Sequence, residues 1–538
     1  MADGRVITEV YVSWDGTAAF SGPYDRVTPD TAGDPGLALD AGLDGLRALS
    51  PPKIVALDFE LFNHDGTYSQ NRPGSPVYQR VLPGRPINVQ MSYGDRRAYR
   101  ADAAYRADHG YRGTIPYTMA RTHIDDIAQT TTYGEQRVRI GSLGLESTLN
   151  NTTVSVALTQ NIRVDQAIAL VLDAAGWPSG ARRLAISDTM LRWFWVDDRT
   201  PWSVLLELLA AEGPGLVYVD GDATFVFENR NYRATAAHAT TSQAVLFDRG
   251  QQAADPYRSA IAYRDASLYR GGAAALWFTA LEYDPGFKSI RNRATYRTEQ
   301  RTAGPLGPVW TYQGDLLLGG VGSVRTVVAR PNDPFINPVV PVAGTDFTAT
   351  GGTVSVTVNA ASGFVAFVTF TTTAGTPTLT GVQLRAQPVV LLEEVVVTNA
   401  IDASESIDTF SPVPGAAIPQ MLQVAGWPCV DVSVAEAVCD AWVARYMEPR
   451  PAVTVTLRNA DDRHARLLLE TRVSDRLTIS ERNTGLQTDV WVNTKRVIVG
   501  GAGGRAVVCE LGCEQVEGTI GFVWDGGTTL WDTALWGR

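Results

Sequence analysis

Cysteine is scarce in this sequence, with only Cys429, Cys439, Cys509 and Cys513 among 538 residues. Four cysteines are too few for the disulfide framework of a small secreted protein. Cys509 and Cys513 lack the two-residue spacing of a zinc knuckle, and the five histidines are scattered without an HExxH motif. We therefore expect buried free thiols, with a disulfide or a metal site as the less favoured alternative, and we expect neither a metal nor a cofactor.

Long apolar runs and lysine are also scarce. No segment approaches the roughly 20 apolar residues of a membrane span, and the N-terminus MADGRVITEV lacks the basic and apolar regions of a secretory signal. Only three lysines occur, and the formal net charge is −11. Tight binding to nucleic acid needs Lys and Arg to neutralise phosphates, so this charge predicts a protein that DNA can slide past without being gripped.

Motifs for catalysis are missing as well. There is no GxSxG or Walker motif, and the glycine-rich segments 319–323 and 500–504 do not open a helix. Residues 61–72 fail as a calcium loop because Leu61 and Arg72 stand where acids are needed. Four adjacent acidic pairs favour solvated turns over the separated carboxylates of a glycosidase: Asp125–Asp126, Asp197–Asp198, Glu393–Glu394 and Asp461–Asp462. We expect no catalytic residues and a protein that is not an enzyme.

Alternation of apolar and polar residues marks strands toward both ends of the chain. Val55–Leu61 and Ile87–Tyr93 alternate cleanly around the polar stretch 63–79, and the same period returns in several segments after residue 452. A long loop of this kind, rich in proline, is expected to be ordered and to pack against its own domain or a neighbouring subunit.

Helical periodicity appears in three places. The first helix is predicted to begin at a capping Asp165 and to end before Gly176, and the second to begin at Pro201 and to end at Gly213. A hairpin with Asp220–Gly221 as its turn follows, which completes a compact α/β module. A third helix is predicted over 433–447, with Ser433 and Glu436 forming a capping box.

The fold class predicted from these patterns is mainly β with a small α/β module, built as two tube-like β-barrel domains plus an inserted β-sandwich. The predicted domains are an N-terminal β-barrel (1–158), an α/β module with two helices (159–237), a β-rich segment (238–337), an inserted small β-sandwich (338–400), a C-terminal β-barrel with one helix (401–520) and a Trp-Asp tail (521–538).

Three blocks of sequence, in order, resemble the minor tail proteins of bacteriophages, of the tail-tip or baseplate hub type found in siphophages. The first is the strand–loop–strand segment over 57–94. Its matching positions are Asn63, Asp65, Gly66, Tyr68, Ser69, Asn71, Ser75, Pro76, Tyr78, Pro83, Gly84 and Pro86. Arg72 intrudes where the family has proline, and Leu82 replaces an arginine. The other blocks are RVDQAIALVLDAAGWP with 201–230, and 447–459 with 475–499.

The resemblance implies a structural hub protein at the distal end of the virion tail. In that family the hub is a homotrimer whose β-barrels form a ring that continues the tail tube. Its implied partners are tail tube and distal tail proteins, the tape measure protein, and other tail-tip proteins or fibres. DNA crosses the lumen at genome ejection without specific binding. The alternatives left open are a host cell-wall or carbohydrate-binding tail protein that uses residues 338–400, and a hydrolase.

Overall fold

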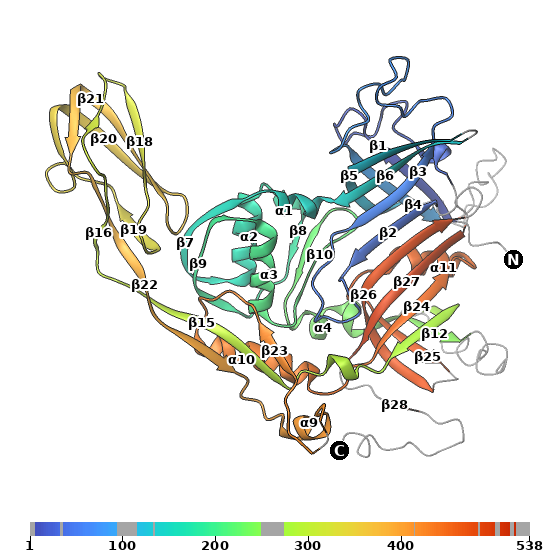
Figure 1. Ribbon diagram of the computed structural model, residues 1–538. Coiled ribbons are helices and arrows are strands. Elements are labelled where there is room, and N and C mark those ends of the chain that lie inside the picture. Colours follow the sequence, from blue (N-terminus) through green and yellow to red (C-terminus); the bar gives the residue numbers. More distant parts are fainter. Residues whose placement is uncertain are drawn as a thin grey trace, which may run out of the picture.

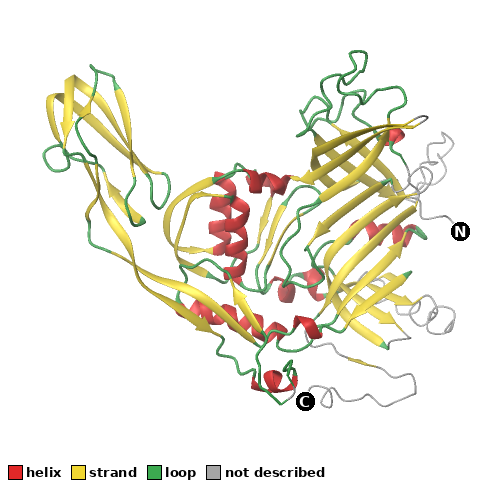
Figure 2. Cartoon of the chain, viewed as in Figure 1, coloured by secondary structure: helices red, strands yellow, loops and turns green. Residues whose placement is uncertain are grey.

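A computed structural model describes residues 6–32, 36–93, 116–132, 135–248, 274–413, 415–481, 485–500, 506–516 and 521–522. Strands form 49% of the described residues and helices 17%, so the prediction of a mainly β protein is confirmed (Figure 2). Apart from residues 521–522, the predicted Trp-Asp tail lies outside the described residues.

A 14-stranded sheet joins the two ends of the chain. Its N-terminal strands follow the order β1–β4–β5–β6–β3–β2, and β2 then pairs antiparallel with β26, which places Leu39 opposite Val497. Buried Leu57, Phe59 and Leu61 alternate along β3, as the sequence predicts. The strands of this half are β1 (Val6–Val12), β2 (Leu37–Gly42), β3 (Ala56–Phe62), β4 (Pro86–Tyr93), β5 (Tyr117–Thr132) and β6 (Glu135–Gly144).

The C-terminal half of the sheet branches at β26. This strand pairs with β25, β27 and β28 as well as β2, and β25 continues through β12 to β13. Helix α11 (Asp462–Glu470) lies beside β24 and β4. The strands are β12 (Ser242–Asp248), β13 (Ala274–Phe278), β14 (Ala280–Asp284), β24 (Ala452–Arg458), β25 (Arg476–Glu481), β26 (Leu486–Gly500), β27 (Ala506–Gln515) and β28 (Gly521–Phe522).

The α/β module lies next to this sheet (Figure 1). Pro201 opens α3, and Gly176 follows α2 with a φ of 75°, both as predicted. The predicted Asp220–Gly221 begins the turn between β10 and β11, but the turn runs to Thr224 and its positive φ lies at Ala223. The elements are β7 (Val154–Arg163), α2 (Val164–Ala174), β8 (Arg182–Leu184), β9 (Met190–Arg199), α3 (Pro201–Glu212), β10 (Leu216–Val219) and β11 (Phe225–Glu228), with the short helices α1 (Thr148–Asn151), α4 (Tyr232–Thr235) and α5 (Ala237–Thr240).

Two predicted helix caps are wrong. Helix α2 begins at Val164 with Arg163 at the N-cap, so Asp165 lies inside the first turn, where its carboxylate accepts from Arg163 Nε at 2.9 Å. Helix α10 spans Val432–Tyr446 with Asp431 at the N-cap, so Ser433 lies inside the helix and forms no capping box. In both cases the N-cap lies two residues earlier than predicted, which is the usual size of error in boundary prediction.

A distal module stands apart at the end of a two-stranded ribbon made by β15 and β22 (Figure 1). Three of its strands, β16 to β18, precede residue 338, and they pair with β21 and β22. The elements of the ribbon and the module are β15 (Arg293–Ala303), β16 (Gly307–Thr311), β17 (Leu316–Leu317), β18 (Val324–Ala329), β19 (Phe335–Val339), β20 (Thr348–Ala360), β21 (Ala366–Thr380), β22 (Gln383–Thr398), α9 (Ser404–Thr409) and β23 (Met421–Val424).

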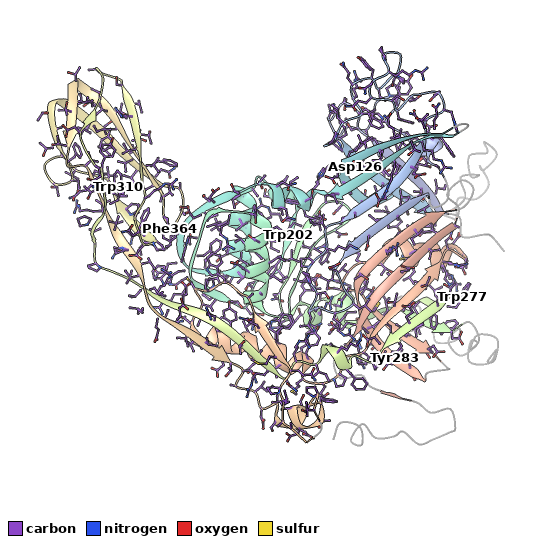
Figure 3. The ribbon with its side chains drawn as sticks, viewed as in Figure 1. Asp126, Trp202, Trp277, Tyr283, Trp310 and Phe364 are labelled. Atoms are coloured by element: carbon purple, nitrogen blue, oxygen red, sulfur yellow. The ribbon has the colours of Figure 1, made fainter. Side chains whose placement is uncertain are left out.

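Three large hydrophobic cores follow this division. One fills the 14-stranded sheet, a second packs the α/β module against α10 and the ribbon, and a third lies inside the distal module. The distal module contacts β9 through a short loop, where Ser362 Oγ donates to Asp197 Oδ1 at 2.6 Å and the rings of Phe364 and Trp195 lie 6.2 Å apart (Figure 3). This contact and the ribbon hold the module in place.

The polar stretch 63–79 packs on its own sheet. Tyr68 is buried, its ring lies 5.7 Å from that of Trp14, and its hydroxyl donates to Asp30. Val77 is also buried, whereas Tyr78 is 37% exposed. Of the two packing modes left open by the sequence, the structure therefore shows contact with the loop's own domain.

Candidate functional site

The densest group of buried charges lies where the large sheet, the α/β module and α10 meet. At its centre is Glu514 on β27, a fully buried carboxylate that accepts from Arg445 Nη2 at 2.9 Å and from Tyr446 Oη at 2.6 Å. Burial would raise the pKa of Glu514, but the charges of Arg445 and Arg450 outweigh it and hold that pKa below its ordinary value. The carboxylate is therefore ionised and ties α10 to the sheet.

Arg233 extends this group toward the α/β module. It projects from α4, and its guanidinium donates to Asn493 Oδ1 at 2.6 Å and to Ser474 Oγ at 3.0 Å. The guanidinium carbons of Arg233 and Arg445 lie 5.3 and 5.7 Å from the centre of the Trp491 ring. Burial, with the nearby Arg445, lowers the pKa of Arg233 to about 10, so it stays charged at neutral pH.

Glu228 forms the far end of the group, on β11. Its carboxylate accepts from Ser474 Oγ and, at 3.0 Å, from Tyr218 Oη. Burial raises the pKa of Glu228 above its ordinary value, although the charge of Arg233 opposes the shift. We call the set Tyr218, Glu228, Arg233, Arg445, Tyr446, Ser474, Asn493 and Glu514 the polar junction.

The polar junction can fix geometry but has no arrangement for chemistry. Every named group bonds to another member or to the adjoining backbone, and removal of one partner from a buried ion pair costs about 3–5 kcal/mol. Sequence reasoning did not find it, because its members come from segments up to about 300 residues apart and none belongs to a local motif. The available signal was Glu514, one of two glutamates in the otherwise largely apolar strand AVVCELGCEQ.

One side-chain relay outside the polar junction resembles a catalytic triad in its order. Tyr232 Oη lies 3.2 Å from His238 Nε2, and His238 Nδ1 lies 2.9 Å from Asp475 Oδ1. A nucleophile must be activated by a lowered pKa or by a base in a site open to substrate. Burial and the charge of Glu228 instead raise the pKa of Tyr232. The Tyr232–His238–Asp475 contacts therefore join α4, α5 and the segment before β25, which is a structural role.

The structure places the acidic pairs and the cysteines that the sequence singles out. Asp125–Asp126, Asp197–Asp198 and Glu393–Glu394 lie within strands β5, β9 and β22, so the prediction of turns is wrong for these three pairs. Asp461 caps α11 by accepting from His464 N at 2.9 Å. All four cysteines are buried and free, as predicted, and burial raises the pKa of Cys509 to about 11.

The described residues contain no group of three or more His, Cys, Asp or Glu side chains that could hold a metal ion. Within the same part of the chain, no helix has both the length and the apolar character to cross a membrane. An open depression of about 260 Å³ beside the start of α10 is lined by Asp188, Arg230, Asn231, Ser433, Val434 and Ala437.

Comparison with known proteins gives distant structural similarities. The chain is similar to a tail protein from Neisseria meningitidis MC58 (TM-score 0.47, 10% identity, 96% of this chain and 97% of the other). It is also similar to the 43 kDa tail protein of prophage MuSo2 from Shewanella oneidensis (TM-score 0.45, 9% identity, 94% and 98%). A third similarity is to prophage tail protein gp18 from Listeria monocytogenes EGD-e (TM-score 0.39, 9% identity, 95% and 95%). No protein-family model and no curated protein matches the sequence.

Proposed function

We propose that this chain is a structural subunit of a phage-type tail tip. It forms a homotrimeric ring at the distal end of the virion tail and continues the tail tube. The tape measure protein and then DNA pass through the ring at genome ejection. Tail tube and distal tail proteins bind on one side, and other tail-tip proteins or fibres bind on the other. The chain has no catalytic role.

The observation that carries the proposal is the set of three sequence blocks that resemble tail hub proteins in the same order. The first block, which covers β3, the loop and β4, folds as one ordered unit around buried Tyr68. The second supplies α2, α3 and the β10–β11 hairpin, and the third supplies β24 to β26. All three blocks fold as ordered units in this one chain, in the same order as in the tail hub family. This supports the same structural role for this chain.

The strand pairing supports a tube-like wall in the C-terminal half. Pairings run from β26 through β25 and β12 to β13, and only Thr279 separates β13 from β14. From β14 they return through β24 and β27 to β26. Thr279 N donates to Thr456 O at 2.8 Å, which keeps the chain paired with β24 at the bend. Closure of this circuit would remove exposed strand edges, which a ring-forming β protein must manage.

The domain division is part of the proposal. Residues 1–158 form one ring domain, and residues 401–520 form the other together with β12, β13 and β14 of the predicted segment 238–337. The α/β module (159–237) lies between them in the sequence. The inserted module is extended from the predicted 338–400 to begin at Gly307, because β16, β17 and β18 pair with β21 and β22. The polar junction then sets the angle between the ring wall and the α/β module.

An electron cryo-microscopy map of the intact tail tip tests the assembly directly. The expected map has three copies of this chain around an open channel directly below the tail tube. A map without three-fold symmetry at this chain, or with the chain away from the channel, would refute the proposal. A zymogram against peptidoglycan and glycans at several pH values tests the non-enzymatic role, since a cleared band from the purified chain would contradict it.

A second candidate is binding to host cell wall or carbohydrate, favoured by the projection of the distal module and by its outward face. That face carries Thr326, Val328, Phe367, Thr369 and Thr357, which offer hydroxyl groups and a ring without formal charge. The measurement is sedimentation of the full chain with host cell walls.

The variant Phe367→Arg should abolish that co-sedimentation, whereas Phe287→Arg, at an exposed phenylalanine outside the distal module, should not. Equal binding by both variants and the wild type would refute the second candidate.

A further inference from the structure

Strand β20 forms an open edge of the distal module. In its sheet, β21 pairs with β17 and β18 on one side and with β20 on the other. Among the described residues, no strand pairs with the outer edge of β20. From Val354 to Ala360 the pairing of β20 with β21 is regular, so this half of the strand presents a straight edge.

Hydrogen-bond direction identifies the groups at that edge. Ala361 N donates to Val365 O at 2.8 Å, and bonded pairs alternate with non-bonded pairs along an antiparallel ladder. Ser355 and Thr357 therefore bond to β21, and the backbone groups of Val354, Val356 and Val358 point outward. The neighbouring ladder agrees, because Thr372 N donates to Ser323 O at 2.9 Å, which directs the even-numbered residues of β21 toward β18.

The edge of β20 lacks the charged side chains that two other strand edges of the same molecule carry. No charged residue occurs between Asp346 and Arg385. By contrast, β18 carries Arg325, and the ribbon part of β22, which pairs only with β15, carries exposed Glu393 and Glu394. Charged side chains on an edge strand are a common defence against pairing with another chain. The edge of β20 is therefore unprotected over a longer regular run than the short uncharged edge strands β16, β19 and β23 offer.

We propose that β20 pairs antiparallel with β20 of a second copy of this chain and joins two distal modules into one continuous sheet. The unpaired groups along this edge are backbone N–H and C=O groups. A second extended strand is the partner that can form hydrogen bonds with both kinds of group along the whole edge. Two copies of the segment VSVTVNA can pair with each other in antiparallel orientation. Centred on Val356, it places Ser355 opposite Thr357 and Val354 opposite Val358, with no like charges facing each other.

The outward face of the module already contains the contacts that such a pair would extend. Thr326 Oγ1 and Thr369 Oγ1 lie 2.9 Å apart, and Thr353 Oγ1 and Thr373 Oγ1 lie 2.8 Å apart, in both cases across neighbouring strands. Ser355 and Thr357 stand on the same face and would continue this row of hydroxyl pairs into the second copy. This interface does not depend on the proposed ring.

The first test measures the mass of the full chain by size-exclusion chromatography with light scattering. Thr357→Lys places a charge at the open edge without touching the core, and it should halve the mass of the assembly. The matched control Thr326→Lys adds the same charge to the same face at β18 and should leave the mass unchanged. Both variants should unfold at the wild-type temperature, since both side chains are exposed.

The second test introduces a single cysteine at Ser355, Val356 or Thr357 and oxidises the full chain. The four native cysteines are buried, so the wild type should give no cross-linked product. The residue nearest the two-fold axis should give a disulfide-linked dimer on a non-reducing gel.

The proposal is overturned if none of the three cysteine variants forms a dimer, or if both lysine variants change the mass equally. Failure of these tests leaves the three-fold ring of the proposed function untouched, because the ring is judged by its symmetry in the tail-tip map.

Discussion

The buried carboxyl group of Glu146 should make the stability of the fold depend on pH. It lies in the turn after β6 and is 1% exposed. One carboxylate oxygen accepts from Val55 N, and the other, Oε2, has no hydrogen-bond partner. Burial raises the pKa of Glu146 to about 7 from an ordinary value of 4.5, although the bond from Val55 opposes the shift. This carboxyl group is therefore far easier to bury when it is protonated.

The sign of the effect on stability follows from the raised pKa. Below pH 4.5 the carboxyl group is protonated in both the folded and the unfolded chain, and its contribution to stability is fully present. As the pH rises toward and through about 7, the unfolded chain loses its proton first and that contribution is lost. The difference between the two pKa values corresponds to about 3 kcal/mol of unfolding free energy.

The perturbation is Glu146→Gln, which keeps the shape of the protonated side chain and cannot ionise. The free energy of unfolding of variant and wild type should be measured in urea at pH 5, 6, 7 and 8. The stability of the variant relative to the wild type should rise with pH and gain about 2.5 kcal/mol between pH 5 and pH 8. Glu393→Gln, at an exposed carboxylate on β22, is the control and should show no such trend. A difference for Glu146→Gln that stays constant across this range would refute the reasoning.

Three further predictions concern packing. Glu514→Gln should lower the free energy of unfolding by about 3–5 kcal/mol, since it leaves Arg445 buried without its counter-charge. By contrast, Glu510→Gln, at a half-buried glutamate of the same strand paired with exposed Arg496, should change it by under about 0.5 kcal/mol in the same urea titration. Tyr68→Ala should destabilise the chain by about 3–5 kcal/mol through a core cavity while Tyr78→Ala is nearly neutral; equal effects would contradict the packing of the loop. Gly363→Val should detach the distal module from β9, because a Cβ there would lie 2.5 Å from the Trp195 ring, and small-angle X-ray scattering should show a larger radius of gyration with an unchanged unfolding temperature.

Much of the local structure follows from short-range chemistry, and the sequence predicts it well. The alternation in Val55–Leu61 has the period of a strand with one buried face, and the structure buries that face. Pro201 begins a helix because its missing N–H is not needed there, and Asp220–Gly221 marks the position of the hairpin turn, although the positive φ in that turn lies at Ala223. These features depend on a few neighbouring residues, so no tertiary information is needed to find them.

The sequence alone thus determined that the chain is mainly β, where its principal strands and helices lie, and that its thiols are buried. Only the tertiary structure decided that β2 pairs with β26 more than 400 residues away, that Tyr68 packs inward while Tyr78 does not, and that Glu514 meets Arg445 in the polar junction. The periodicity of the sequence shows which face of a helix or strand is apolar. It does not show which other helix or strand will pack against that face. Long-range pairing and buried charge are fixed by packing of the whole chain, because a buried carboxylate is tolerated only where folding brings a cation to it.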